Sequence, residues 1–200
     1  MRITRRNVLP ITGGFLLIGS GVLALHALDG WAAAEVERWR PALERTIALP
    51  VGHPIRIGEY QGLRPWGLAF GPSRISASKL DPSQVSLAGF TVTLDPLASL
   101  RRWKPVVALR FRGLKAQLQR KEDGRYWTFG GSESNDPPPN LELRYSFDQP
   151  ARITFKPGGE QLAIQSRGAI QFDNSRFQTS SSLSWLDQAG TLRLDGGGRW

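Results

Sequence analysis

The chain has 200 residues, of which 40% are hydrophobic, and a formal net charge of +9. Its lack of cysteine excludes disulfides and thiolate metal sites, while 22 glycines and 14 prolines predict many turns. These values fit one domain with its appendages, or a piece of something larger.

The first predicted element is a membrane anchor over residues 1–28. Arg2, Arg5 and Arg6 precede the stretch 8–28, which contains no Asp, Glu, Lys or Arg. A helix of this length spans about 31 Å, which matches the hydrocarbon core of a bilayer. Because basic flanks stay in the cytoplasm, we expect a single pass with the N-terminus cytoplasmic and the bulk of the chain outside.

Two other interpretations of this segment stay open. A cleaved signal peptide has an apolar region of about 7–15 residues, shorter than this one, but residues 32–34 (AAA) offer a cleavage site. Residues 4–9 (TRRNVL) also resemble a twin-arginine export signal. All three interpretations export the remainder of the chain, so they argue against a soluble cytoplasmic protein.

The segment 29–50 is predicted to form an amphipathic helix. Its apolar residues recur every three or four positions and form one stripe. The stripe consists of Val36, Trp39, Leu43 and Ile47. Pro41 is expected to kink or split the helix, because proline lacks the N–H that a helix interior uses. The stripe requires a partner, either the adjacent domain or the bilayer surface.

Residues 56–76 (RIGEYQGLRPWGLAFGPSRIS) contain four glycines and two prolines. Their spacing matches neither a P-loop nor the dinucleotide-binding pattern G-x-G-x-x-G. We therefore predict a structural joint between the helix and the first strand, with Trp66 packed on the helix stripe.

From residue 51 onward the apolar residues alternate with a period of two, which predicts strands. The predicted strands are 85–94, 106–112, 114–120, 125–129, 141–147, 151–155, 160–166, 168–172, 175–186 and 191–195. Residues 51–131 form a first sheet segment with a hairpin turn at 123–124, 132–140 form a Pro-rich loop, and 141–200 continue the sheet. The fold class is mainly β, with an anchor and an amphipathic helix before an elongated antiparallel meander that has one apolar face. We expect this sheet to continue in a longer native chain, because a meander that ends without a cap leaves an open edge.

Motifs for catalysis or metal binding are absent from the sequence. The two histidines, His26 and His53, lie in different predicted elements, and the 17 carboxylates are scattered. No G-x-S-x-G elbow or zinc-ligand spacing occurs. We predict a protein that is not an enzyme and has no catalytic residues, metal site or cofactor.

Positive charge is concentrated between residues 96 and 125. This stretch carries nine Lys or Arg residues against Glu122 and Asp123. An anionic partner such as phospholipid head groups, lipopolysaccharide or a cell-wall polymer would explain the charge. The alternative is a solvated strand face that protects a sheet edge. Export of the domain argues against nucleic acid.

Three stretches resemble the N-terminal region of the TamB family within the AsmA-like superfamily, most closely its cyanobacterial and chloroplast-envelope members. They are LPVGHPIRIGEYQGLRPWGLAFGPSRIS (49–76), DPLASLRRWKPVVALRFRG (95–113) and GRYWTFG (124–130). The resemblance implies a taco-shaped β-sheet that extends from the bacterial inner membrane into the periplasm and serves outer-membrane biogenesis. Its apolar groove would carry phospholipid, or the protein would assist assembly of outer-membrane proteins with a barrel partner of the Omp85 type, or both.

The resemblance also assigns candidate site residues. The groove floor would consist of Leu141, Leu143, Tyr145, Phe147, Ile153, Phe155, Leu162 and Ile164. Anionic head groups would contact Arg101, Arg102, Lys104, Arg110 and Arg112. One alternative is an exported, membrane-anchored binding or scaffold module without lipid transfer, which a sheet closed into a filled sandwich would favour. Another is an exported hydrolase, for which the sequence shows no polar cluster.

Overall fold

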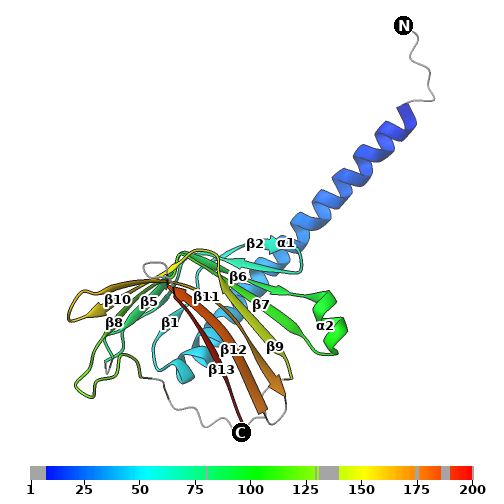
Figure 1. The fold of residues 1–200 in the computed structure, drawn as a ribbon. Coiled ribbons are helices and arrows are strands. Elements are labelled where there is room, and N and C mark those ends of the chain that lie inside the picture. Colours follow the sequence, from blue (N-terminus) through cyan, green and yellow to red (C-terminus); the bar gives the residue numbers. More distant parts are fainter. Residues whose placement is uncertain are drawn as a thin grey trace.

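The computed structural model describes residues 8–79, 81–128, 130, 140–173, 176–185 and 190–199, and only the backbone for 8–27. Helix α1 (Val8–Val51) has 44 residues and extends away from a β-domain (Figure 1). No helix within the described residues combines the length and apolarity needed to cross a membrane. Arg2, Arg5 and Arg6 lie outside the described residues, and the anchor stays a prediction.

Helix α1 is continuous through Pro41, so the predicted split into two helices is wrong, while the kink stays a prediction. The predicted anchor and the predicted amphipathic helix are parts of the same element. Proline removes one N–H but holds φ near its helical value. Ion pairs from Glu35 to Arg38 at 2.6 Å and from Glu37 to Arg40 at 2.5 Å add support just before the proline.

The predicted apolar stripe of α1 does not form the contact with the sheet. Its exposed members are Trp39, Leu43 and Ile47. A polar side of the helix contacts the sheet instead. The hydroxyl of Tyr60 lies 2.5 Å from Oδ1 of Asp29, and the backbone N–H of Ile57 donates to Glu44 at 2.7 Å. The helix is therefore held by specific hydrogen bonds at two points 15 residues apart.

One sheet contains all thirteen strands of the described residues. They are β1 (Ile55–Arg56), β2 (Tyr60–Arg64), β3 (Gly67–Phe70), β4 (Ser73–Ile75), β5 (Gln84–Leu87), β6 (Gly89–Leu94), β7 (Val106–Arg112), β8 (Lys115–Gln119), β9 (Glu142–Phe147), β10 (Ala151–Lys156), β11 (Gln161–Asp173), β12 (Arg176–Trp185) and β13 (Gly190–Arg199). The bounds of β7 match the prediction. The predicted strand 85–94 is divided into β5 and β6, while 160–166 and 168–172 are joined in β11.

Ten of the strands are halves of five longer strands, each bent once. β1 and β2 form one pair of halves, followed by β3 with β4, β5 with β6, β7 with β8, and β9 with β10. Each half pairs with the corresponding half of the next long strand, so the bends line up as a crease across the sheet. β11 crosses this line unbroken and pairs with β10 at 161–164 and with β9 at 167–171. Figure 1 shows two arms of the sheet descending from a common crest.

The glycine-rich stretch 56–76 lies at this crease, but the predicted joint between the helix and the first strand is wrong. The stretch contains β2, β3 and β4, and residues 52–54 connect α1 to β1. Gly58 lies against the backbone of Gly71, where a Cβ would overlap the Gly71 carbonyl group. The expected packing of Trp66 on the helix stripe is wrong. Trp66 has a φ of 65° in the turn between β2 and β3, and its side chain is 70% exposed.

The sheet is mixed, so the predicted purely antiparallel meander is wrong. β7 pairs with β9 and β8 pairs with β10 in parallel, while the other neighbours are antiparallel. Parallel neighbours require a crossover, which residues 120–141 supply. The turn at 123–124 is present, but residues 125–128 pack against other loops and form no strand. Of the predicted Pro-rich loop, residues 132–139 lie outside the described residues.

Candidate functional site

The register places the predicted groove residues of the strands on one face of the sheet. We call the arm formed by β2, β3, β6, β7 and β9 the upper arm, and the arm formed by β1, β4, β5, β8 and β10 the lower arm. In the upper arm, Tyr145 lies opposite Leu109 of β7 and Phe147 lies opposite Phe111. In the lower arm, Ile153 lies opposite Leu162. We call this surface the apolar face. It carries Leu143, Tyr145 and Phe147 of β9, Ile153 and Phe155 of β10, and Leu162 and Ile164 of β11; Leu141 directly precedes β9.

A row of four phenylalanines crosses the apolar face next to the crease. The ring centroids of Phe70 and Phe90 are 4.7 Å apart, those of Phe90 and Phe111 are 6.3 Å apart, and those of Phe111 and Phe147 are 6.1 Å apart. The sequence-based assignment named only Phe147 of this row. The alternation in 85–94 and 106–112 could have identified Phe90 and Phe111, since both lie on the apolar side of their strands.

The apolar face is lined by large side chains but is not sealed by another layer of the described chain. Among the described residues the buried hydrophobic side chains are Ala32, Ala69, Phe70, Val106, Ala116, Ala151 and Ile164. Of these seven, Phe70, Ala116, Ala151 and Ile164 lie on the apolar face, and two of the four are alanines, whereas a filled core buries mainly Leu, Ile, Val and Phe. The other groove residues remain half-buried. Local cover comes from Tyr126, whose ring lies 5.2 Å from that of Phe155.

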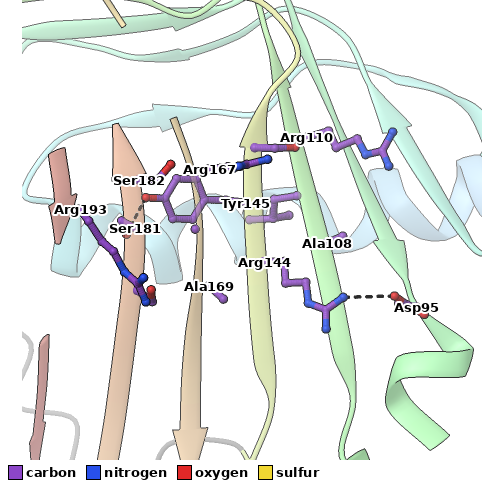
Figure 2. A pocket seen from close by; sticks show the side chains of 14 residues that line it. Asp95, Ala108, Arg110, Arg144, Tyr145, Arg167, Ala169, Ser181, Ser182 and Arg193 are labelled. Atoms are coloured by element: carbon purple, nitrogen blue, oxygen red, sulfur yellow. Dashed lines mark hydrogen bonds and ion pairs between the residues drawn. The ribbon is translucent and has the colours of Figure 1, made fainter. Parts of the chain in front are cut away.

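The opposite face carries a groove with a volume of about 590 Å³ (Figure 2). One row across five strands alternates arginine and serine in direct register: Arg110, Ser146, Arg167, Ser182 and Arg193. The neighbouring row adds Ala108, Arg144, Ala169 and Ser180. We call this surface the arginine groove.

Among the described residues, two arginines of the groove form ion pairs and two do not. Arg144 lies 2.8 Å from Glu142 and 3.4 Å from Asp95, and Arg193 lies 3.0 Å from Asp195. Within the described chain, Arg110 and Arg167 form no ion pair, and both are exposed. Guanidinium groups beside serine hydroxyls can bind phosphate, sulfate or carboxylate oxygens.

The five residues predicted to contact head groups fall in two places. Arg101 and Arg102 lie in helix α2 (Pro96–Arg102), and Lys104 follows it. Arg110 and Arg112 lie on β7, on the face opposite to Phe111. Arg110 and Arg112 are therefore separated from the apolar face by the thickness of the sheet.

Helix α2 was missed by the sequence-based prediction, although its start signal is clear. Asp95 caps the helix by accepting from the N–H of Ala98 at 2.9 Å, and Pro96 takes the first helical position. This combination of an acidic cap and a proline at the first position is typical of helix starts.

A buried polar cluster, also missed, holds the lower arm together. The carboxylate of Asp81 lies 2.8 Å from Nζ of Lys121 and 3.4 Å from Nε2 of His53. It also accepts from the backbone N–H groups of Ser83 and Thr128. Burial alone would raise the pKa of Asp81, but these hydrogen bonds, first that from Lys121, hold the pKa well below the usual range.

The cluster connects three segments that are far apart in the sequence. His53 follows α1, stacks on Trp127 at a centroid distance of 4.2 Å and lies 3.1 Å from the Ser76 carbonyl oxygen. The side chains of His53 and Asp81 are 2% and 1% exposed, so a substrate cannot reach them. Within the described residues, no group of three or more His, Cys, Asp or Glu could hold a metal ion.

Comparison with protein families and with curated proteins yields no match. The resemblance to the TamB family rests on the residues quoted above, and family membership stays a prediction.

Proposed function

We propose that this protein is a membrane-anchored, lipid-binding β-sheet of the periplasm that belongs to a TamB-like bridge in outer-membrane biogenesis. Phospholipid acyl chains would lie on the apolar face. The observation that carries this proposal is the aromatic row from Phe70 to Phe147 on the apolar face, in which Phe90, Phe111 and Phe147 stay half-buried. A sandwich core, which would favour a scaffold without lipid, is not found among the described residues.

The physical gain comes from removing apolar surface from water. Strands lie about 4.8 Å apart, so the four phenylalanines cover roughly 14 Å across the strands. Each methylene group buried against such a surface contributes about 0.8 kcal/mol. An acyl chain that follows the row would cover side chains that are now half-exposed. A role in assembly of outer-membrane proteins with an Omp85-type partner rests on the resemblance alone.

Photo-crosslinking from the apolar face tests this proposal. A photoreactive phenylalanine analogue at Phe147 is expected to yield phospholipid adducts in cells, detected by mass spectrometry. Arg152 on β10 is the matched control, because it is exposed and its side chain lies on the opposite face. Absence of adducts at Phe147, or equal adducts at Phe147 and Arg152, would refute the lipid proposal.

A second candidate function is binding of an anionic polymer by the arginine groove. The specific observation in its favour is the register of Arg110, Arg167 and Arg193 across five strands, with two of the three free of ion pairs within the described residues. This would make the protein an exported binding or scaffold module. Substitution of Arg110 and Arg167 separates the two functions, since it leaves the apolar face unchanged.

A further inference from the structure

Helix α2 presents its apolar side chains to solvent. Leu97, Leu100 and Trp103 are 81%, 68% and 89% exposed, and no residue of the helix is buried. Such a contiguous group of large apolar side chains on a soluble surface marks a contact with another protein or a membrane.

The helix is held firmly on the sheet. The Ser99 hydroxyl donates to the Asp95 carbonyl at 2.6 Å and accepts from the backbone N–H of Val106 at 2.9 Å. Arg102 binds Glu142, which is buried at the start of β9. The exposed position of Leu97, Leu100 and Trp103 is thus a property of the packed fold and does not result from a frayed end.

The charges around α2 are complementary to an anionic surface. Arg101, Arg102 and Lys104 lie beside Trp103. The nearby acid Asp95 is already used as the helix cap and as a partner of Arg144 at 3.4 Å. A short helix with apolar residues on one side and cations beside them is typical of the membrane interface, where tryptophan is also enriched.

The side of the domain that carries α2 also carries the exposed Trp66 and the point where α1 leaves the domain. The N–H of Leu94, which directly precedes Asp95, donates to the Trp66 carbonyl at 2.8 Å. Asp29 of α1 accepts from the backbone N–H of Leu63 in the same hairpin at 2.9 Å. Figure 1 shows the β2 hairpin and α2 on the side from which α1 extends toward the N-terminus.

We propose that this side of the domain docks on the surface of the anionic membrane from which α1 emerges. Leu97, Leu100 and Trp103 enter the interfacial region, and Arg101 and Lys104 bind lipid phosphates. We call these five residues the docking edge. This inference rests on the membrane anchoring and lipid binding proposed above. It adds how the sheet is oriented relative to the membrane surface.

Docking also gives lipid a path onto the sheet. Leu94 is 44% exposed, lies at the end of β6 and faces Val107 on the apolar face. It directly precedes the capped start of α2. An acyl chain that leaves the bilayer beside α2 would therefore meet the apolar face without crossing water.

A single fluorescent label tests the docking edge in the full chain. The protein has no cysteine, so Leu100→Cys allows an NBD label at one site while Trp103 is retained. The protein is inserted into vesicles of phosphatidylcholine with phosphatidylglycerol, and quenching by lipid-borne nitroxides is measured. The matched control is Glu160→Cys, exposed beside the β10 turn, which Figure 1 shows on the other side of the domain from α2.

The label at position 100 is expected to be quenched and blue-shifted, and the label at position 160 is not. Arg101→Gln with Lys104→Gln is expected to weaken this contact roughly twenty-five-fold, at about fivefold per cation lost. Arg102 is kept in these variants because it binds Glu142.

Three results would overturn the inference. Equal quenching at positions 100 and 160 in vesicle-bound protein would refute docking alone, while lipid adducts at Phe147 would still support the proposed function. Shielding of the label that persists in detergent and increases with protein concentration would assign the edge to a second copy of the chain. Failure of the chain to remain in the vesicles would refute the anchoring as well.

Discussion

The Tyr145 hydroxyl on β9 lies 2.8 Å from Oγ of Ser181 on β12, although β11 separates these two strands. The contact is possible because the strand between them carries Gly168 at this position. A Cβ on Gly168 would lie 2.8 Å from Cε1 of Tyr145 and 2.8 Å from the Ser181 hydroxyl. Tyr145 thus covers the position where Gly168 lacks a side chain, and it connects β9 to β12 across β11.

Gly168→Ala is expected to destabilise the protein by about 1–3 kcal/mol, because the added methyl group displaces the Tyr145 ring. The measurement is urea unfolding in detergent. Gly196→Ala is the matched control, since a Cβ there meets only Cγ2 of Thr179 at 3.4 Å. Tyr145→Phe removes only the hydroxyl and is expected to cost about 1 kcal/mol. Equal stability of the two alanine variants would contradict the packing described here.

Asp81→Asn is expected to destabilise the protein by about 3 kcal/mol at pH 7, because Lys121 loses its buried partner. The depressed pKa of Asp81 means that the unfolded chain binds this proton more readily than the folded protein. Its contribution is therefore complete above the ordinary carboxyl pKa of about 4 and is lost as the pH falls through and below that value. Urea unfolding at several pH values is expected to show that the free energies of unfolding of the wild type and of Asp81→Asn become equal at acidic pH.

Asp173→Asn is the control for this pH dependence. Asp173 is exposed at the end of β11, and its replacement is expected to change stability by less than about 0.5 kcal/mol. If the difference in free energy of unfolding between wild type and Asp81→Asn stays constant down to acidic pH, the ion pair is not the cause of the destabilisation.

Tyr60 is expected to ionise at a higher pH than the ordinary tyrosine value of about 10. Burial, with the hydrogen bond and negative charge of Asp29, raises the pKa of Tyr60 to about 12. The folded protein therefore holds this proton between pH 10 and 12, and stability is expected to fall as the pH rises through that interval. Absorbance titration of Asp29→Asn should show the pKa of Tyr60 moving back toward 10. An unchanged titration would mean that α1 does not pack on β2 through this bond.

Arg110→Gln with Arg167→Gln is expected to weaken binding of a soluble polyphosphate chain roughly fivefold per arginine, at about 1 kcal/mol each. Calorimetric titration at two salt concentrations measures this, since an electrostatic contact weakens with salt. Arg152→Gln, on the same face of the lower arm, is the control. Lipid adducts at Phe147 should persist in the double variant. Wild-type affinity in the double variant would remove the arginine groove as a binding site.

The individual strands were predictable because alternation is a local property. The segments 106–112 and 151–155 show one apolar and one polar residue in turn, and each pattern predicts a strand whatever its partner is. The apolar face was predictable for the same reason, and the register places Tyr145, Phe147 and Ile153 on one side as expected.

The sequence-based predictions are wrong where contacts between distant segments determine the structure. The stripe of α1 predicted contact through Trp39 and Leu43, but the helix docks through Asp29 and Glu44 because edge strands offer unpaired N–H groups. Residues 125–128 have a strand pattern, yet Tyr126 and Trp127 serve as cover for Phe155 and His53. The polar cluster of Asp81 and Lys121 joins residues 40 positions apart and leaves no local pattern.

The sequence by itself determined that the chain after residue 51 forms two-faced strands and that positive charge gathers between 96 and 125, because both follow from the order of side chains along the chain. Only the tertiary structure decided which strands are neighbours, where the crease runs and on which face each arginine lies. The parallel return of β9 beside β7 depends on the crossover through 120–141 and on contacts that form only after distant segments meet. This arrangement puts the phenylalanine row and the arginine groove on opposite faces of the sheet and leaves the apolar side chains of α2 on a third surface of the domain.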